Sequence, residues 1–503
     1  MMSYDAIQWL FASLSLLWVF CLGAIVGSFI NVIAHRLPAG QGIVRPPSAC
    51  PACGTRLTWR ENIPIFGWLL LRGRCRFCRS PISPQYPIVE LATALLFAFP
   101  YTLWFMDPSV FELLGVTTDA WSPEWTRNPM WGAVWPYFTA ILALVGALVA
   151  ITLIDAKTFM IPLSLPVFTT IVGLCAHAGM GLWHDLGGID LVTASDHRWV
   201  IPLPRGPAVG LTVGVAIGLI LSNALLLAGI IRHSFHDYET WEKRAMEEAD
   251  ARADTDIAPQ QAGEERLSIV SLLGRTLALT GPCLALMFIG FAVGARMGNQ
   301  QLGIALGAGA GLVVGIFLRR SIASPDASSD EPIWLQYPHT TREILRELAF
   351  LAPAIVLGII GFSLTMPGGA LAHLAEPGPT LWVHAMLGSI FGYIVGGGLI
   401  WGLRIVGSLA MGREAMGLGD VHLLAGVGAV VGWVDPAIAF LVAPFLAIAW
   451  FILSTIFASV FNRKGTAIPF GPHLAAASVL IIYGKPLVES GLSLILGRVV
   501  DLT

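Results

Sequence analysis

Two aspartates stand where apolar segments end or begin. An ionisable side chain in such a place costs free energy, which makes it a candidate for a functional role. Asp155 follows one apolar stretch of the chain, and Asp420 follows Gly417-Leu418-Gly419 and opens another. Two carboxylates that face each other can share one proton, because like charges about 3 Å apart cannot both ionise. One then takes a proton from water while the other polarises a carbonyl, which is the chemistry of peptide hydrolysis without a metal.

Each of these residues also has a simpler interpretation. Asp155 alone could be a charge at the end of a helix, and Asp420 alone could cap the helix that follows it. Gly417 and Gly419 favour the chemical interpretation of the second position, because glycine lets a peptide approach the backbone closely. We therefore take the two aspartates as candidate catalytic residues and the two glycines as candidate substrate-binding residues.

Four cysteines form two C-x-x-C pairs in one polar loop. They are Cys50, Cys53, Cys75 and Cys78, with 21 residues between the pairs. This spacing is close to that of a zinc ribbon, with a slightly long central gap, and thiolates suit tetrahedral Zn²⁺. The alternatives are two disulfides or four reduced thiols, and a reducing compartment disfavours the disulfides. The pattern predicts a structural zinc site.

The composition predicts an all-α polytopic membrane protein. The chain has 503 residues, of which 55% are hydrophobic and 12% charged, with a mean hydropathy of +0.73. A soluble domain usually carries about 25% charged residues. Apolar runs predict about twelve spanning helices. They lie at about 7–34, 87–106, 134–154, 160–182, 206–231, 276–294, 300–318, 348–366, 381–406, 421–434, 436–461 and 469–495.

The loop charges predict the orientation of these spans. Loop 35–86 carries eight arginines against one acid, Glu61, which places it on the cytoplasmic side. The acid-rich loops 107–131 and 183–204 then lie outside. Each of the two aspartates follows a span that runs from outside to inside, so both are expected at the cytoplasmic face.

An ordered set of short motifs resembles the type IV prepilin peptidases, the GxGD-type membrane aspartyl proteases. The matching motifs are Gly27-Ser28-Phe29-Ile30-Asn31-Val32, His35-Arg36-Leu37-Pro38, Cys50-Pro51-x-Cys53, Trp59-x-Glu61-Asn62-Ile63-Pro64, Leu71-Arg72-Gly73-Arg74-Cys75-x-x-Cys78, Tyr86-Pro87-Ile88-Val89-Glu90, Glu414-Ala415-Met416-Gly417-Leu418-Gly419-Asp420 and Pro469-Phe470-Gly471-Pro472. Asp155 matches the first catalytic aspartate of that family and Asp420 the second. The matching regions cover about 300 of the 503 residues.

The resemblance implies an aspartic endopeptidase of the bacterial inner membrane. Such an enzyme cleaves the basic leader of type IV prepilin-like precursors at the cytoplasmic face. Many members also methylate the new N-terminus with S-adenosylmethionine. The chain shows no Rossmann-type G-x-G-x-x-G motif after a strand, so methylation rests on the resemblance alone. The expected partners are prepilin or pseudopilin precursors and the lipid bilayer, with no nucleic acid.

The chain departs from the family pattern in two places. His422 stands where the family usually has a lysine, and a histidine supplies positive charge only when it is protonated. Residues 183–380 form an insertion with four extra spans and two polar cytoplasmic stretches. The expected division of the chain is a first span at 1–34, the cysteine loop at 35–86, a core with the first aspartate at 87–182, the insertion at 183–380 and a core with the GxGD motif at 381–503.

Two other functional classes remain open at this point. One is a catalytically inactive membrane scaffold of a pilus or type II secretion system, which the presence of both aspartates disfavours. The other is an ion-coupled transporter that uses Asp155 and Asp420 as a proton or ion pair. Transporter sites tend to lie near the bilayer midplane, whereas these aspartates are expected at its edge.

A linker replacement tests whether the polar stretch of the insertion is accessory. Residues 237–265 carry ten acids against Lys243, Arg244 and Arg252, so this stretch should be solvated rather than packed in a core. Replacing 240–262 with a flexible Gly/Ser linker of similar length should leave peptidase activity within a few-fold of the parent, measured on a leader-bearing pseudopilin. Loss of cleavage with normal expression and zinc content would contradict this and favour a gating role.

Overall fold

The computed structural model describes residues 4–105, 131–187, 200–234, 340–374, 380–411, 414–461 and 469–497, and single positions between 285 and 314. The chain forms two compact units. The first contains residues 1–203, 379–398 and 419–503, and the second contains 204–378 and 399–418. All structural statements below concern the described residues.

The first unit is built from helices. They are α1 (Tyr4–Arg36), α2 (Phe66–Leu70), α3 (Gln85–Phe105), α5 (Trp131–Thr158), α6 (Ser164–Asp185), the N-terminal part of α12 (Leu381–Met411), α13 (Leu418–Val431), α14 (Val434–Phe461) and α15 (Gly471–Leu496). In the parts of the chain that the structure describes, β-structure is confined to two isolated bridges in the cysteine loop, Ala49 with Arg56 and Arg74 with Pro81. The chain is therefore an all-α protein, as expected.

Within the described residues, eight helices are long and apolar enough to cross a membrane, which makes the chain a multi-pass membrane protein. They are α1, α3, α5, α6, α7 (Pro207–Leu227), α11 (Thr340–Thr365), α12 and α14. These confirm eight of the expected spans. The spans expected at 276–294 and 300–318 lie outside the described residues, apart from a few single positions.

Of the other two expected spans, one is a short helix and the other is an interrupted helix. The span expected at 421–434 is α13, which has 14 residues and a length of about 21 Å, against a bilayer core of about 30 Å. The span expected at 469–495 is α15, which is interrupted by non-helical backbone at Gly484. Neither helix is among the eight.

Helix α13 lies buried in the first unit. Every residue from Asp420 to Val431 is buried except His422. Two glycines of α13 have no room for a Cβ: Gly428 would meet the backbone of α12 and Gly426 the side chain of Thr169 on α6. Small residues at such contacts let helix backbones approach closely, which stabilises helix pairs within a bilayer.

Side chains from both neighbours also bind the α13 backbone. Ser389 Oγ of α12 donates a hydrogen bond to the carbonyl of Ala429, at 2.6 Å. His177 Nε2 of α6 lies 2.8 Å from the carbonyl oxygen of Val430. These bonds hold the C-terminal turn of α13 between α6 and α12.

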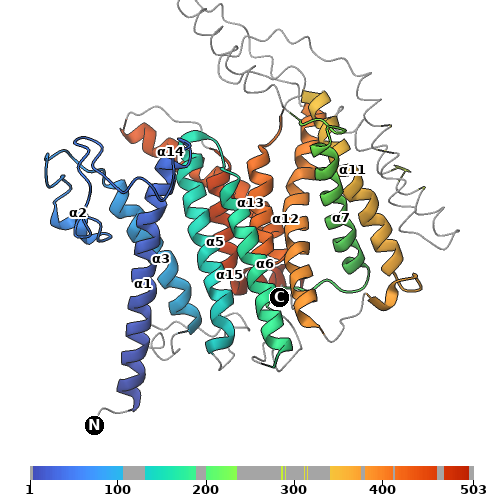
Figure 1. Ribbon diagram of the computed structural model, residues 1–503, viewed down its shortest axis with the longest axis horizontal. Helices are drawn as coiled ribbons and strands as arrows, with labels where there is room; N and C mark the ends of the chain where they lie inside the picture. Colours follow the sequence, from blue (N-terminus) through green and yellow to red (C-terminus); the bar gives the residue numbers. More distant parts are fainter. Residues whose placement is uncertain are drawn as a thin grey trace, which may run out of the picture. The chain divides into compact units, whose positions relative to one another are not determined.

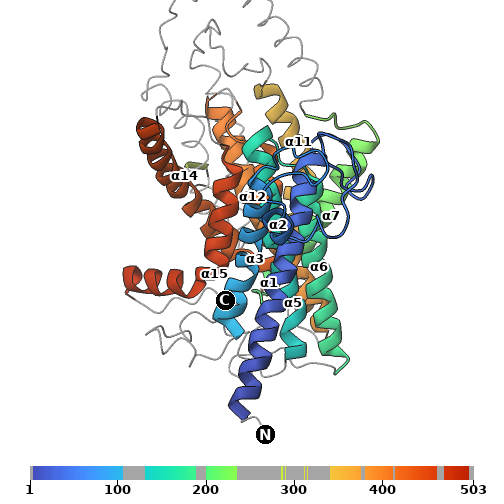
Figure 2. The same ribbon diagram turned by 90° about the vertical axis from the view of Figure 1, so that its left-hand side faces the viewer.

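Helices α1 and α3 lie side by side in both views (Figure 1, Figure 2). A Cβ at Gly23 or Gly27 of α1 would lie 2.7 Å from the Cα of Ala94 or Glu90 of α3. Asn31 near the end of α1 donates a hydrogen bond to the carbonyl of Tyr86, at 3.2 Å. The cysteine loop and α2 lie at this end of the pair (Figure 1). The contacts between α1 and α3 therefore hold the two ends of the loop in place.

The second unit contains α7, α11, the short helix η3 (Ala372–Leu374) and the C-terminal part of α12. Helix α7 places a glycine at every fourth position, Gly210, Gly214 and Gly218, and each faces backbone of α11 with no room for a Cβ. Ser222 continues this row and donates a hydrogen bond to the carbonyl of Phe350 on α11, at 2.5 Å. The two inserted helices are therefore a tightly packed pair.

A pair of glycine substitutions in α12 tests the packing around α13. A Cβ at Gly392 would overlap the carbonyl of Gly428, whereas a Cβ at Gly398 of the same helix would meet nothing within 4 Å. Gly392→Ala should destabilise the protein by about 1–3 kcal/mol through overpacking. Gly398→Ala should be neutral or stabilising by up to about 1 kcal/mol, because alanine is the better helix former.

The measurement is the apparent Tm of the purified protein in detergent. Gly398→Ala serves as the matched control for the effect of adding a methyl group to α12. Equal apparent Tm values for the two variants would contradict the packing described for α12 and α13.

Candidate active site and cysteine cluster

Asp155 lies in the last turn of α5 and is almost completely buried, with 4% of its surface exposed. Its carboxylate accepts a hydrogen bond from the backbone N–H of Gly471, the first residue of α15. A helix N-terminus offers free N–H groups and the positive end of the helix dipole, which favours a carboxylate. Gly471 has no room for a side chain, because a Cβ there would overlap Oδ2 of Asp155. The start of α15 thus fixes the orientation of this carboxylate.

Asp420 lies in the first turn of α13, and 8% of its surface is exposed. The preceding Gly419 packs against Ile161, since a Cβ at Gly419 would lie 2.8 Å from the Cβ of Ile161. The same isoleucine faces Gly471, where a Cβ would lie 3.1 Å from Cδ1 of Ile161. Ile161 therefore contacts the glycine beside Asp420 in the sequence and the glycine that binds Asp155.

The remaining residues expected near the site lie at the same end of α13. Gly417 is exposed and directly precedes the helix, whereas Gly419 is half-buried. His422 follows within the first turns of α13 and is also half-buried. The substrate-binding role of the two glycines stays a prediction.

Two residues of this site were given no role by the sequence. The sequence shows Gly471 only as part of the motif Pro469-Phe470-Gly471-Pro472, although the proline after it is typical of the first turn of a helix. Ile161 offered no signal, because an isoleucine in a short segment between two apolar helices is ordinary. Its contacts come only from the tertiary fold.

The four cysteines of the loop come together as expected. Their sulfur atoms all lie within 4.8 Å of one another, and Cys50 Sγ lies 3.8 Å from Cys78 Sγ. A tetrahedral site with Zn–S bonds of about 2.3 Å has sulfur–sulfur edges of about 3.8 Å. None of the four is in a disulfide, and Cys50 and Cys75 are buried while Cys53 and Cys78 are exposed. This donor set fits a metal ion such as Zn²⁺.

The first half of the cluster is a tight turn built on Cys50. The carbonyl of Cys50 accepts a hydrogen bond from the N–H of Gly54, and its own N–H donates to the carbonyl of Thr55, both at 2.9 Å. Its sulfur accepts hydrogen bonds from the backbone N–H groups of Cys53 and Ala52, which lower the pKa of Cys50 to about 6. The thiolate, which is the form that binds a metal, is therefore favoured at neutral pH.

The second half repeats this turn at Cys75. The carbonyl of Cys75 accepts a hydrogen bond from the N–H of Arg79 at 3.0 Å, and its N–H donates to the carbonyl of Ser80 at 2.9 Å. Arg79 has a φ of 61° and takes the place of Gly54, whose φ is 69°. Only the first half uses glycine for this left-handed position, so Arg79 carries some backbone strain.

Glu61 connects the two halves of the loop. Its side chain is 4% exposed and forms an ion pair with Arg76 at 3.0 Å. It also accepts hydrogen bonds from the hydroxyl and the backbone N–H of Thr58. Thr58 and then Arg76 lower the pKa of Glu61 to about 2. This stabilising contribution is present above the ordinary carboxylate range and is lost as the pH falls toward about 2.

Glu90 of α3 anchors the loop to the helices. Its carboxylate accepts a hydrogen bond from the N–H of Ile65 at 2.6 Å. Ile65 has φ 63° and ψ −57°, and the N–H of Phe66 donates to the carbonyl of Pro64, which makes a γ-turn with positive φ. Such a turn is rare and strained, above all for a β-branched residue. The buried carboxylate of Glu90 helps to hold it.

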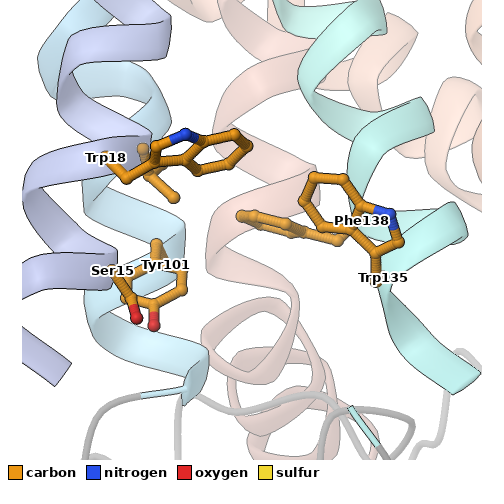
Figure 3. A pocket seen from close by; sticks show the side chains of 6 residues that line it. Ser15, Trp18, Tyr101, Trp135 and Phe138 are labelled. Carbon is orange, nitrogen blue, oxygen red and sulfur yellow. The ribbon is translucent and has the colours of Figure 1, made fainter. Parts of the chain in front are cut away.

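A cavity of about 290 Å³ is lined by residues of α1, α3 and the N-terminal part of α5 (Figure 3). Its lining is mainly aromatic and consists of Ser15, Trp18, Val19, Tyr101, Trp135 and Phe138. Phe138 and Asp155 are separated by about 25 Å along α5 at a rise of about 1.5 Å per residue. The cavity is therefore separate from the candidate active site.

Residues 21–104 match the family model of the bacterial peptidase A24 N-terminal domain. No solved structure matches the chain.

Several curated relatives are prepilin leader peptidase/N-methyltransferases. The one from Myxococcus xanthus (strain DK1622) is 37% identical over 181 residues, which is 36% of this chain and 46% of the relative. The one from Aeromonas hydrophila is 36% identical over 186 residues, 32% of this chain and 53% of the relative. The one from Klebsiella pneumoniae is 46% identical over 104 residues, 20% of this chain and 44% of the relative. The chain thus spans about half the length of the curated relatives it matches.

Metal analysis tests the cysteine cluster. Protein purified without chelators should carry about one Zn²⁺ per chain, and Cys75→Ser should lower this content because it removes one of four thiolates. Cys175→Ser is the matched control, because Cys175 is an exposed cysteine of α6 outside the cluster. An absence of zinc from the parent protein, or equal zinc in both variants, would rule out the site.

Proposed function

We propose that this chain, a member of the type IV prepilin peptidase family, is an aspartic endopeptidase that cleaves the basic leader of prepilin-like precursors at the cytoplasmic face of the bacterial inner membrane. The observation that carries this proposal is the pair of buried aspartates whose neighbouring glycines, Gly419 and Gly471, both contact Ile161. The relatives are prepilin leader peptidase/N-methyltransferases, which supports the same activity for this chain. They favour neither an inactive scaffold nor a transporter.

The proposed chemistry uses Asp155 and Asp420 as a pair that shares one proton. The ionised carboxylate takes a proton from a water molecule, and that water attacks the scissile carbonyl. The protonated carboxyl polarises the carbonyl oxygen and later donates its proton to the leaving amine. The N–H of Gly471 keeps the Asp155 carboxylate in one orientation throughout. The products are a leader with a new carboxyl end and a precursor with a new amino end.

The substrate would reach this pair along the membrane. The apolar helix of a pilin-like precursor lies in the bilayer, and its basic leader stays on the cytoplasmic side for the same reason that the arginine-rich loop does. The exposed Gly417 and the half-buried Gly419 stand next to Asp420 without side chains. We assign them to contact with the extended backbone of the peptide at the scissile bond.

Two cofactors belong to this proposal in different ways. Zinc bound to Cys50, Cys53, Cys75 and Cys78 would supply folding free energy to a loop with little core of its own, and it takes no part in hydrolysis. S-adenosylmethionine would serve the N-methylation of the new amino end that the relatives' names include. No residue of this chain is assigned to that second activity.

Replacing either aspartate with asparagine should abolish cleavage. Asp155→Asn and Asp420→Asn keep the shape of the side chain but remove the shared proton, so the rate should fall by about 10²–10⁴-fold or more. The measurement is mass analysis of a purified pseudopilin after incubation with each variant in lipid. Membrane insertion and zinc content should not change.

Asp185→Asn is the matched control for this experiment. Asp185 is an aspartate of the same unit, and it caps α12 by accepting hydrogen bonds from the N–H groups of Leu381 and Trp382. Its variant should cut the substrate within a few-fold of the parent. Cleavage by Asp155→Asn or Asp420→Asn at a rate near that of the parent would contradict the assignment of these residues as the catalytic pair.

A further inference from the structure

Arg404 of α12 is a completely buried charge in the second unit, with 0% of its surface exposed. Its guanidinium binds Glu347 of α11 through two contacts, Nη2 to Oε1 at 3.0 Å and Nε to Oε2 at 3.3 Å. A guanidinium held by both oxygens of a carboxylate has a fixed plane and direction. The remaining nitrogen, Nη1, is thus aimed by this pairing.

That nitrogen points at the segment before the GxGD motif. Nη1 of Arg404 donates a hydrogen bond to Oε1 of Glu414 at 2.6 Å and another to the backbone carbonyl of Met416. Residues 414–417 have no regular secondary structure, and Asp420 follows four residues after Met416. The segment is also bound to α12 by a further hydrogen bond, which the N–H of Ala415 donates to Oγ of Ser408 at 2.9 Å.

Glu347 is itself held in place on the other side. It is 2% exposed, and its Oε2 accepts a hydrogen bond from Nε1 of Trp401 at 2.8 Å. Ile344 of α11 packs with Ile405 and Leu409 of α12 next to this pair. Both members of the ion pair are therefore fixed by apolar packing and by further hydrogen bonds. Removing Arg404 would leave the buried charge of Glu347 without a counter-ion, and removing the charge of Glu347 would leave Arg404 with only the exposed Glu414. Either change is costly and favours movement of the remaining side chains.

We propose that Arg404 is a positioning residue for Asp420, and that the inserted helix α11 supplies, through Glu347, the carboxylate that fixes Arg404. The inference rests on the proposed function, because it concerns the placement of the second catalytic aspartate. Arg404 touches neither substrate nor water in this scheme. It acts by holding the chain at Glu414 and Met416, so that α13 begins at the right place.

This gives part of the insertion a role in the catalytic core. The polar stretch 240–262 can still be accessory, whereas α11 is required. The residues that need α11 are those whose partners lie on it. Arg404 is such a residue, because its bidentate partner is Glu347.

The test compares three variants of the full chain in lipid. Glu347→Gln keeps the shape of the side chain but removes its charge, and Arg404→Lys keeps the charge but loses the planar fork. Glu343→Gln is the matched control, because Glu343 is equally buried on α11 but forms its ion pairs with Arg342 and Arg346. Two readouts are taken, amide hydrogen exchange at residues 414–420 and the steady-state cleavage of a pseudopilin.

The expected result has two parts. Exchange at 414–420 should be at least about tenfold faster in Glu347→Gln and Arg404→Lys, and unchanged in the control. In the same two variants kcat should fall by about 10- to 100-fold while KM stays within about threefold, because a misplaced catalytic group slows chemistry without weakening leader binding. Unchanged exchange in both variants, or equal effects in the Glu343→Gln control, would overturn the proposal.

A fourth variant covers the case in which Glu347→Gln does not fold. Trp401→Phe removes one hydrogen bond to the same carboxylate and keeps the aromatic packing, so it should raise exchange at 414–420 by about threefold. No rise in that variant would count against the proposal. If the parent protein cuts no leader at all, the proposed function fails, and hydrogen exchange still decides whether Arg404 orders this segment.

Discussion

The contact between Gly392 of α12 and Gly428 of α13 brings two helix backbones together and determines where α13, the helix of Asp420, lies in the first unit. Because neither residue has a side chain, α13 can enter the space between α6 and α12, where every residue from Asp420 to Val431 except His422 is buried. A helix in that position needs no polar or lipid-facing stripe. Its N-terminal turn carries the buried carboxylate of Asp420. A larger side chain at either glycine would displace the helix that carries this carboxylate.

A glycine without a side chain also allows the contact that holds Asp155. The carboxylate, Gly471 and Ile161 occupy one small volume where α5 ends and α15 begins. The cysteine loop follows the C-terminal end of α1 and precedes the N-terminal end of α3, and a buried carboxylate, Glu90, connects it to α3 at a strained turn. Both arrangements use a carboxylate that accepts a backbone N–H from another segment. In each case a long-range bond sets the geometry of a short irregular segment.

The sequence predicted the parts of this fold that depend on local pattern. Apolar runs predicted α1, α3 and α14, since a lipid-facing helix must be both long and apolar, and C-x-x-C spacing predicted the cysteine cluster. The expected span at 421–434 was the weakest, because α13 is shielded by protein and its length follows its neighbours rather than the bilayer. Ile161 at the site and the pairing of Arg404 with Glu347 could not be predicted, since each joins residues that only the tertiary fold brings together. The span count also predicts that both aspartates lie at the same face of the membrane, which stays a prediction.

The length of α13 has a consequence for how the protein meets lipid. Hydrophobic mismatch acts on helices that touch the acyl chains, and α13 is shielded from them by its neighbours. A helix of about 21 Å can therefore exist inside a core of about 30 Å without thinning the bilayer around it. One or both of its ends must then stop below the headgroups, where irregular backbone is tolerated only if protein or water surrounds it. For residues 414–417, before α13, the surrounding group is protein, because Arg404 and Ser408 of α12 bind this irregular segment.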